Sequence, residues 1–232
     1  MLPEKLRCPS GVFSMIEHLN TDEILRYLGY PAGEHPDEKT ARLIEKCLTL
    51  LSKAVQPKQL AGAFSLVWGE NSLSLADGAL ELSGKAITNH LAGCQECILM
   101  ACTLGIAADR LIRKSQLSSM AEGVVMDACC TALIEAVCDD FQAQLQRQYP
   151  ISTTRFSPGY GDLPITLQKE FLSLLQAERK IGLCANTANL LIPSKSVTAI
   201  LGIGGQMKLP QHPCNLCKNK ERCAFCRHEN KN

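Results

Sequence analysis

The spacing of apolar residues changes at Pro57, and this change limits the possible folds more than any other feature of the chain. Before Pro57, a segment opened by Asp37 carries apolar residues three or four positions apart, as the core-facing side of a helix does. These residues are Ala41, Ile44, Cys47, Leu48, Leu51 and Val55. From Leu60 to Leu82 the apolar residues instead form short runs separated by Gly-Glu-Asn-Ser and Ala-Asp-Gly turns, which predicts an antiparallel meander. The chain must therefore combine helices with antiparallel strands.

The remaining segments mix the same two patterns. We expect helices over residues 20–29, 84–94 and 163–182, and buried strands over residues 96–105 and 196–205. Residues 106–149 are strongly helical, with a candidate interruption near Gly123 and an inward apolar stripe from Val124 to Leu145. Four acidic residues of this segment do not belong to the apolar stripe, and their role has to be sought elsewhere: Asp127, Glu135, Asp139 and Asp140. Because strands and helices do not alternate regularly, the sequence predicts an α+β fold with a mainly antiparallel twisted sheet and packed helices.

The chain of 232 residues is long enough for one main domain with a modest appendage. We expect the main domain to span residues 1–206, with a helical N-terminal part over 1–58. Residues 207–232 differ in composition, since they carry six Lys/Arg against two Glu and four of the thirteen cysteines. We expect this segment to be a small Cys-rich appendage.

Charge and hydropathy exclude several classes of partner. The net charge of +1, with no long Lys/Arg run before residue 200, argues against nucleic acid and anionic membranes as partners. The N-terminal sequence MLPEKLRCPSGVF lacks the apolar segment of a signal peptide, and the best apolar run, Cys97 to Cys102, is too short to span a bilayer. The prediction is a cytoplasmic protein.

Most of the cysteines read as reduced thiols. The expected lack of a signal peptide and the odd count of thirteen both argue against a disulfide framework. Cys47 and Cys102 lie among apolar residues, where a thiol serves as a small buried hydrophobe.

Four cysteines of the tail have a different spacing. Cys214, Cys217, Cys223 and Cys226 follow a C-x2-C-x5-C-x2-C pattern, which can bring four thiolates to one metal centre. Zinc would make the tail a structural knuckle or docking patch, whereas an iron-sulfur cluster would make it an entry point for an electron. A flexible tail of reduced thiols is the remaining alternative.

The segment RFSPGYGDLP, residues 155–164, combines an arginine with a turn of two prolines, two glycines and a tyrosine. Such a loop can aim a guanidinium at a carboxylate, leave backbone groups free and present a ring for stacking. These properties suit a ligand that carries a carboxylate and a flat heterocycle. The alternative is an ordinary turn with Tyr160 packed on the core and Arg155 in solvent.

This segment resembles the signature Arg-Pro-Ala-Pro-Gly-Tyr-Pro-Ala-Cys-Pro of the S-adenosylmethionine-binding reactivation domain of cobalamin-dependent methionine synthase. The similarity continues through LLQAERKIG, which resembles a Leu-Leu-Glu-x-Glu helix of that family, and LLIPSKSVTAI, which resembles its Met-x-Pro-x-x-Ser-Val-Ser-Gly strand entry. The three motifs keep their order over residues 155–200, roughly a fifth of the chain. The chain departs from the family at Asn186 to Ala188, where the family has Thr-Glu-Ser, and it lacks the cobalamin-binding signature.

The resemblance implies a set of site residues. Arg155, the backbone of Ser157, Gly159 and Tyr160 stand where the family holds S-adenosylmethionine. Glu135 stands near the position of a family glutamate close to the methyl-transfer region, which makes it a candidate catalytic residue. The alternative for Glu135 is a solvated carboxylate on a helix face.

The resemblance also implies a role and partners. The chain would be a small free-standing reactivation protein that supports reductive remethylation of cobalamin held by methionine synthase or a related corrinoid methyltransferase, with a reductant such as flavodoxin or ferredoxin. Two alternatives remain: a non-catalytic interaction module that docks a corrinoid protein through a metal-bound tail, and an iron-sulfur electron-transfer protein.

Overall fold

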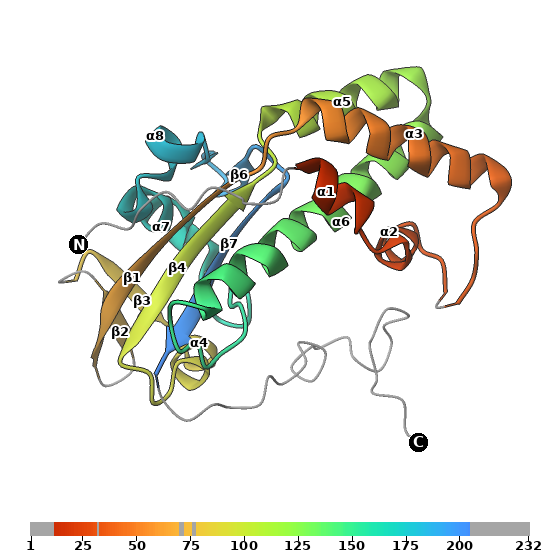
Figure 1. The fold of residues 1–232 in the computed structure, drawn as a ribbon. Coiled ribbons are helices and arrows are strands. Elements are labelled where there is room, and N and C mark those ends of the chain that lie inside the picture. Colours follow the sequence, from red (N-terminus) through yellow and green to blue (C-terminus); the bar gives the residue numbers. More distant parts are fainter. Residues whose placement is uncertain (1–11, 32, 70–71, 76–77, 205–232) are drawn as a thin grey trace.

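The computed structural model describes residues 12–31, 33–69, 72–75 and 78–204. Its centre is a five-stranded antiparallel sheet with the strand order β3-β2-β1-β4-β7, which curls as it crosses the molecule (Figure 1). The strands are β1 (Lys58–Trp68), β2 (Ser72–Leu75), β3 (Leu80–Ser83), β4 (Glu96–Thr103) and β7 (Ser196–Ile203). A separate two-stranded ribbon joins β5 (Cys184–Ala185) to β6 (Leu191–Ile192).

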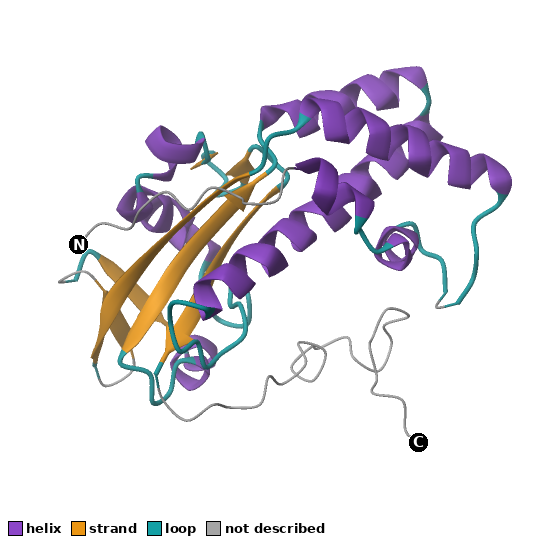
Figure 2. Cartoon of the chain, viewed as in Figure 1, coloured by secondary structure: helices purple, strands orange, loops and turns teal. Residues whose placement is uncertain are grey.

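Helices cover both faces of this sheet (Figure 2). On one face lie α1 (Val12–Glu17), α2 (Thr21–Tyr27), α3 (Glu38–Ala54), α5 (Ile106–Ser118) and α6 (Met120–Gln146). The other face carries α4 (Lys85–His90), the 3₁₀ turn η1 (Ile165–Leu167), α7 (Gln168–Leu175) and α8 (Ala177–Ile181). The prediction of an α+β fold with a mainly antiparallel sheet and packed helices is confirmed.

Strand β4 divides the hydrophobic core into two parts. Ile98, Met100 and Cys102 face the core beneath α6, whereas Cys97, Leu99 and Ala101 face the core beneath α7 and α8. The alternation follows from the period of two along a strand, and every residue of β4 except Glu96 is buried because helices cover both faces.

The first helices begin where their sequences indicate. The side chain of Asn20 accepts a hydrogen bond from the backbone N–H of Asp22 at the start of α2, and Asp37 accepts one from Thr40 at the start of α3. Each cap satisfies a backbone donor that the first turn of a helix leaves without an intrahelical partner.

The long helical stretch breaks at Ser119 rather than at Gly123. Gly123 instead lies in the first turns of α6, where a Cβ atom would come within 2.5 Å of Cγ of Gln116 on α5. The glycine therefore marks the close approach of two helices, not the break between them. The predicted inward stripe is largely buried, at Ala128, Ala132, Leu133, Val137 and Leu145, but its first member, Val124, is exposed.

The helix predicted over residues 163–182 is divided at Gln176, which adopts a left-handed backbone with φ of 55°. The turn lets α7 and α8 both bury apolar side chains in the same core, Phe171 and Leu175 from the first and Ala177 and Ile181 from the second. Gly182 ends α8 with φ of 71°, as its position in the sequence indicated.

No helix in the described part of the chain is long and apolar enough to cross a membrane. The boundary predicted between residues 206 and 207 lies outside the described residues.

Candidate functional site

The loop of residues 155–164 is anchored along the free edge of β7. Phe156 and Ile200 exchange two backbone hydrogen bonds, with N to O distances of 3.0 Å and 2.8 Å. Ile151 forms a second bridge, to Ile203. Paired backbone holds Arg155 and Phe156 in register with the sheet, so the start of the loop has a fixed position.

The turn that follows Phe156 is closed by its own backbone. Gly159 N donates to Leu163 O at 2.9 Å, and Tyr160 N donates to Ser157 O at 3.0 Å. Gly159 and Gly161 have φ of +93° and +56°, which residues with a Cβ rarely adopt. At Gly161 a Cβ would also meet Cβ of Ala86 at 2.7 Å, so this glycine lets the loop lie against α4.

Asp162 ties the far end of the loop to α4. Its carboxylate accepts hydrogen bonds from the backbone N–H groups of Lys85 at 2.8 Å and Ala86 at 3.0 Å. Gly84 precedes the helix with φ of +131°, and a Cβ there would meet Oδ1 of Asp162 at 2.6 Å. The loop is thus held at one end by β7 and at the other by the first turn of α4.

This cap gives the stability of the protein a dependence on pH. The backbone donors of Ala86 and Lys85 lower the pKa of Asp162 below its ordinary value of 3.8. A carboxyl with a lowered folded-state pKa stabilises the protein above its unfolded-state pKa, and that contribution is lost as the pH falls through the folded value. We expect the free energy of unfolding of the wild type to fall more steeply below about pH 4 than that of Asp162→Asn, which urea titrations at several pH values would measure. Glu81→Gln, an exposed change on β3, is the control, and parallel curves for the wild type and Asp162→Asn would contradict the expectation.

Arg155 points away from β7 to a cluster of polar side chains on α6. Its Nη1 lies 2.8 Å from Oδ1 of Asp139 and 3.3 Å from Oε1 of Gln142, and its Nη2 lies 3.3 Å from Oε2 of Glu135. The side chain of Arg155 is 22% exposed. The alternative of a guanidinium free in solvent is therefore wrong, because both terminal nitrogens already donate to protein oxygens.

Glu135 is half-buried beside this guanidinium. Burial of the carboxyl raises the pKa of Glu135 above its ordinary value of 4.5, and the charge of Asp139 acts in the same direction against the opposing effect of Arg155. Glu135 is therefore not a fully solvated carboxylate on a helix face: it contacts a residue of the loop.

Tyr160 stands at the exposed tip of the loop. Its ring meets Phe156 edge to face with 6.1 Å between centroids, and Phe156 in turn lies 4.9 Å from His90. Phe156 is 7% exposed, whereas Tyr160 is 58% exposed. The buried ring supports the exposed one, whose open surface is free to stack on a flat ligand.

Comparison with known proteins gave matches among solved structures, while no protein-family model and no curated protein matches the chain. The crystal structure of the MetH reactivation domain bound to AdoHcy aligns with a TM-score of 0.66 over 90% of this chain and 82% of that one, at 15% sequence identity. The chain has the fold of this reactivation domain. The resemblance inferred from three short motifs is thus confirmed as a likeness of fold.

Two contacts of Arg155 were not predicted from the sequence, those with Asp139 and with Gln142. A signal was present, because Glu135, Asp139 and Gln142 are spaced four and three apart and so share one face of α6. That face looks solvated in the sequence alone, since nothing there shows that an arginine from beyond the helix lies against it.

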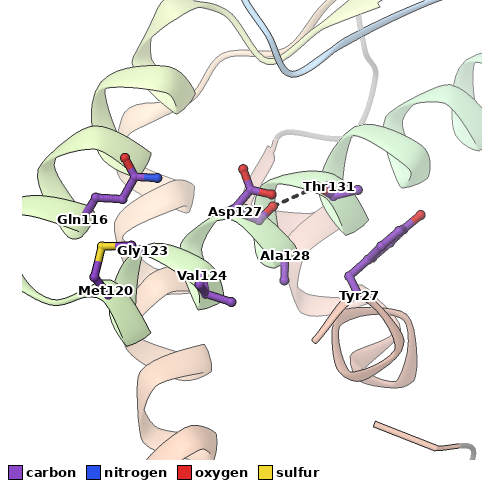
Figure 3. Close-up of a pocket in the computed structure, with 8 residues that line it drawn as sticks. All are labelled: Tyr27, Gln116, Met120, Gly123, Val124, Asp127, Ala128 and Thr131. Carbon is purple, nitrogen blue, oxygen red and sulfur yellow. Dashed lines mark hydrogen bonds between the residues drawn. The ribbon is translucent and has the colours of Figure 1, made fainter. Parts of the chain in front are cut away.

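A pocket of ≈ 260 Å³ lies away from the loop, between α2, α5 and α6 (Figure 3). It is lined by Tyr27, Gln116, Met120, Gly123, Val124, Asp127, Ala128 and Thr131. Asp127 forms an ion pair with Lys195 at 2.9 Å, and Lys195 also donates to Thr131. None of the predicted ligand-binding residues of the loop lines this pocket, so it is a separate feature.

The predicted metal ligands Cys214, Cys217, Cys223 and Cys226 lie outside the described residues. Within the described part of the chain, no group of three His, Cys, Asp or Glu side chains could hold a metal ion. The metal site of the tail stays a prediction from spacing.

Proposed function

We propose that this chain binds S-adenosylmethionine at the loop of residues 155–164 and supports reductive remethylation of cobalamin held by methionine synthase or a related corrinoid methyltransferase. One observation carries the proposal: a loop that resembles the reactivation-domain signature, fixed between β7 and α4, joins a part-buried arginine to an exposed tyrosine. The fold match to a reactivation domain solved with AdoHcy supports it.

The residues present fit such a ligand. The guanidinium of Arg155 already binds a carboxylate, that of Asp139, so it can bind the carboxylate of a methionine moiety in the same way. The exposed ring of Tyr160 offers a stacking surface for an adenine, and the turn at Ser157 and Gly159 offers backbone groups close to it. S-adenosylmethionine would supply the methyl group on its sulfonium.

The contribution of this chain to the reaction is positioning. Arg155 and Tyr160 would hold the two ends of the methyl donor, so that its methyl group has a fixed direction toward a corrinoid carried by the partner. We assign Glu135 to the orientation of Arg155, since its nearest ionic contact is that guanidinium at 3.3 Å. No acid, base or covalent nucleophile of this chain is needed for such a role.

The proposal includes partners that the chain itself does not contain. A cobalamin-binding methionine synthase or corrinoid protein would hold the cobalt, and a reductant such as flavodoxin or ferredoxin would supply the electron. A zinc ion or iron-sulfur cluster on the four tail cysteines would serve docking or electron entry, respectively.

Calorimetric titration of S-adenosylmethionine into the full chain, purified anaerobically, tests the proposal. We expect saturable binding in the micromolar range, with AdoHcy competing for the same site. 5′-Methylthioadenosine, which lacks the amino-acid moiety, should bind more weakly because it has nothing to offer Arg155. If the intact protein binds none of the three compounds, the proposed function is wrong, and docking through the Cys-rich tail becomes the better hypothesis.

A further inference from the structure

The guanidinium of Arg155 is paired with three side chains of α6. Nη1 forms an ion pair with Asp139 and donates a hydrogen bond to Gln142, and Nη2 donates one to Glu135. A carboxylate ligand is bound best when it accepts from both terminal nitrogens at once. A ligand carboxylate that accepts from Nη1 and Nη2 together must therefore displace at least one of these internal acceptors.

Asp139 is the acceptor best placed to move. Its carboxylate makes the shortest contact, 2.8 Å, yet its side chain is 71% exposed, whereas the side chain of Glu135 is 43% exposed. An exposed carboxylate recovers its hydration when it leaves an ion pair, so releasing Asp139 costs little free energy. Releasing Glu135 costs more, because burial already raises its pKa and no comparable access to water compensates the loss of the cation.

The cluster also carries more negative than positive charge. One guanidinium faces two carboxylates, so the three side chains together have a formal charge of −1 when all are ionised. A carboxylate that entered while both acids stayed in place would meet repulsion from each of them. When one of the two carboxylates moves away from Arg155, one cation and one anion remain, and a ligand carboxylate meets less repulsion.

We propose that Asp139 is an internal competitor that occupies Arg155 until the carboxylate of the ligand displaces it, and that it thereby sets the affinity of this site for carboxylate-bearing ligands. This inference rests on the proposed function and adds a residue that opposes ligand binding. Glu135 remains in place and keeps the guanidinium oriented toward the ligand.

The test is titration of S-adenosylmethionine into the full-length wild type and Asp139→Asn. We expect the variant to bind about two to five times more tightly, because the exposed ion pair that has to break is lost and such pairs contribute up to about 1 kcal/mol. Decarboxylated S-adenosylmethionine should bind equally to both proteins, since without a carboxylate it has no competition with Asp139. Glu81→Gln, which removes one exposed negative charge on β3 at the sheet edge opposite to β7, is the control and should leave both affinities unchanged.

The outcomes separate this inference from the proposed function. Weaker binding of both ligands by Asp139→Asn would mean that Asp139 holds the ammonium group of the ligand, and it would overturn the inference alone. An unchanged affinity for S-adenosylmethionine would also overturn it, while leaving the function intact. A gain of equal size for both ligands would overturn the inference too, because a ligand without a carboxylate does not compete with Asp139 for Arg155. Absence of binding by wild type and variant would overturn the proposed function, and the inference with it.

Discussion

Arg155→Ala is expected to weaken the binding of S-adenosylmethionine by about 10- to 150-fold. Hydrogen bonds between a guanidinium and a carboxylate contribute about 1.5–3 kcal/mol when the site is partly desolvated, and each 1.4 kcal/mol is a factor of ten in affinity. Arg155 meets this condition, because only 22% of its side chain is exposed. Calorimetric titration of wild type and variant under the same conditions measures the effect.

Arg155→Lys is the matched control for this change. Lysine keeps the positive charge but has a single ammonium in place of the planar group with two terminal nitrogens, so it cannot pair with a carboxylate through both. We expect an affinity between those of the wild type and Arg155→Ala. Circular dichroism and thermal melting must show that all three proteins are folded, since the alanine variant leaves Glu135 and Asp139 side by side without their cation. Wild-type affinity in folded Arg155→Ala would mean that the loop is not the binding site.

The parts of the fold that follow from local chemistry could be predicted from the sequence. Asn20 and Asp37 cap their helices as their residue types indicate, and the apolar runs beginning near Leu60, Glu96 and Ser196 form strands. In each case the signal and the structure lie within the same few residues. A cap needs only the backbone of the next turn, and a buried strand needs only a run of apolar side chains.

The helix breaks could not be predicted in the same way because they depend on tertiary packing. Gln176 lacks the conformational freedom of a glycine. It nevertheless adopts a left-handed backbone conformation, which lets α7 and α8 both pack into one core. Gly123 looked like the point of interruption, but its small size serves contact with Gln116 of α5. Val124 fits the helical period and is exposed nonetheless, although Leu133 and Val137 of the same stripe are buried as predicted.

The candidate site was predictable for the residues inside the loop and not for those that hold it. Arg155 and Tyr160 were singled out because the segment RFSPGYGDLP is contiguous, and their role in ligand binding stays a prediction. The contacts of Arg155 with Asp139 and of Asp162 with α4 join residues that are 16 and 77 positions apart in the chain, and no spacing rule connects them. What the structure adds is therefore mainly the set of contacts that fix the loop.

The ring of Phe156 also supports the loop, and Phe156→Ala is expected to cost about 3–5 kcal/mol of stability. Phe156 is 7% exposed and belongs to the core beneath α7 and α8, so its removal leaves a cavity under the loop. For a domain of this size the loss corresponds to a melting temperature lower by about 6–20 °C. Thermal denaturation followed by circular dichroism measures the shift, and a melting temperature equal to that of the wild type would show that the loop is held without this ring.

Tyr160→Ala distinguishes support of the loop by Phe156 from direct contact of Tyr160 with the ligand, because Tyr160 belongs to the same loop but is 58% exposed. A surface substitution of this kind is expected to change stability by no more than about 0.5 kcal/mol, so its melting curve should overlay that of the wild type. Its affinity for S-adenosylmethionine should nevertheless fall, since the stacking surface for the adenine is lost. Phe156→Ala, titrated well below its own melting temperature, should also lose affinity, because Tyr160 then lacks the ring that supports it at 6.1 Å. If Phe156→Ala kept the wild-type affinity despite its lower stability, the exposed tyrosine would not need its buried neighbour, and Asp162 and the β7 pairing would be sufficient to place it.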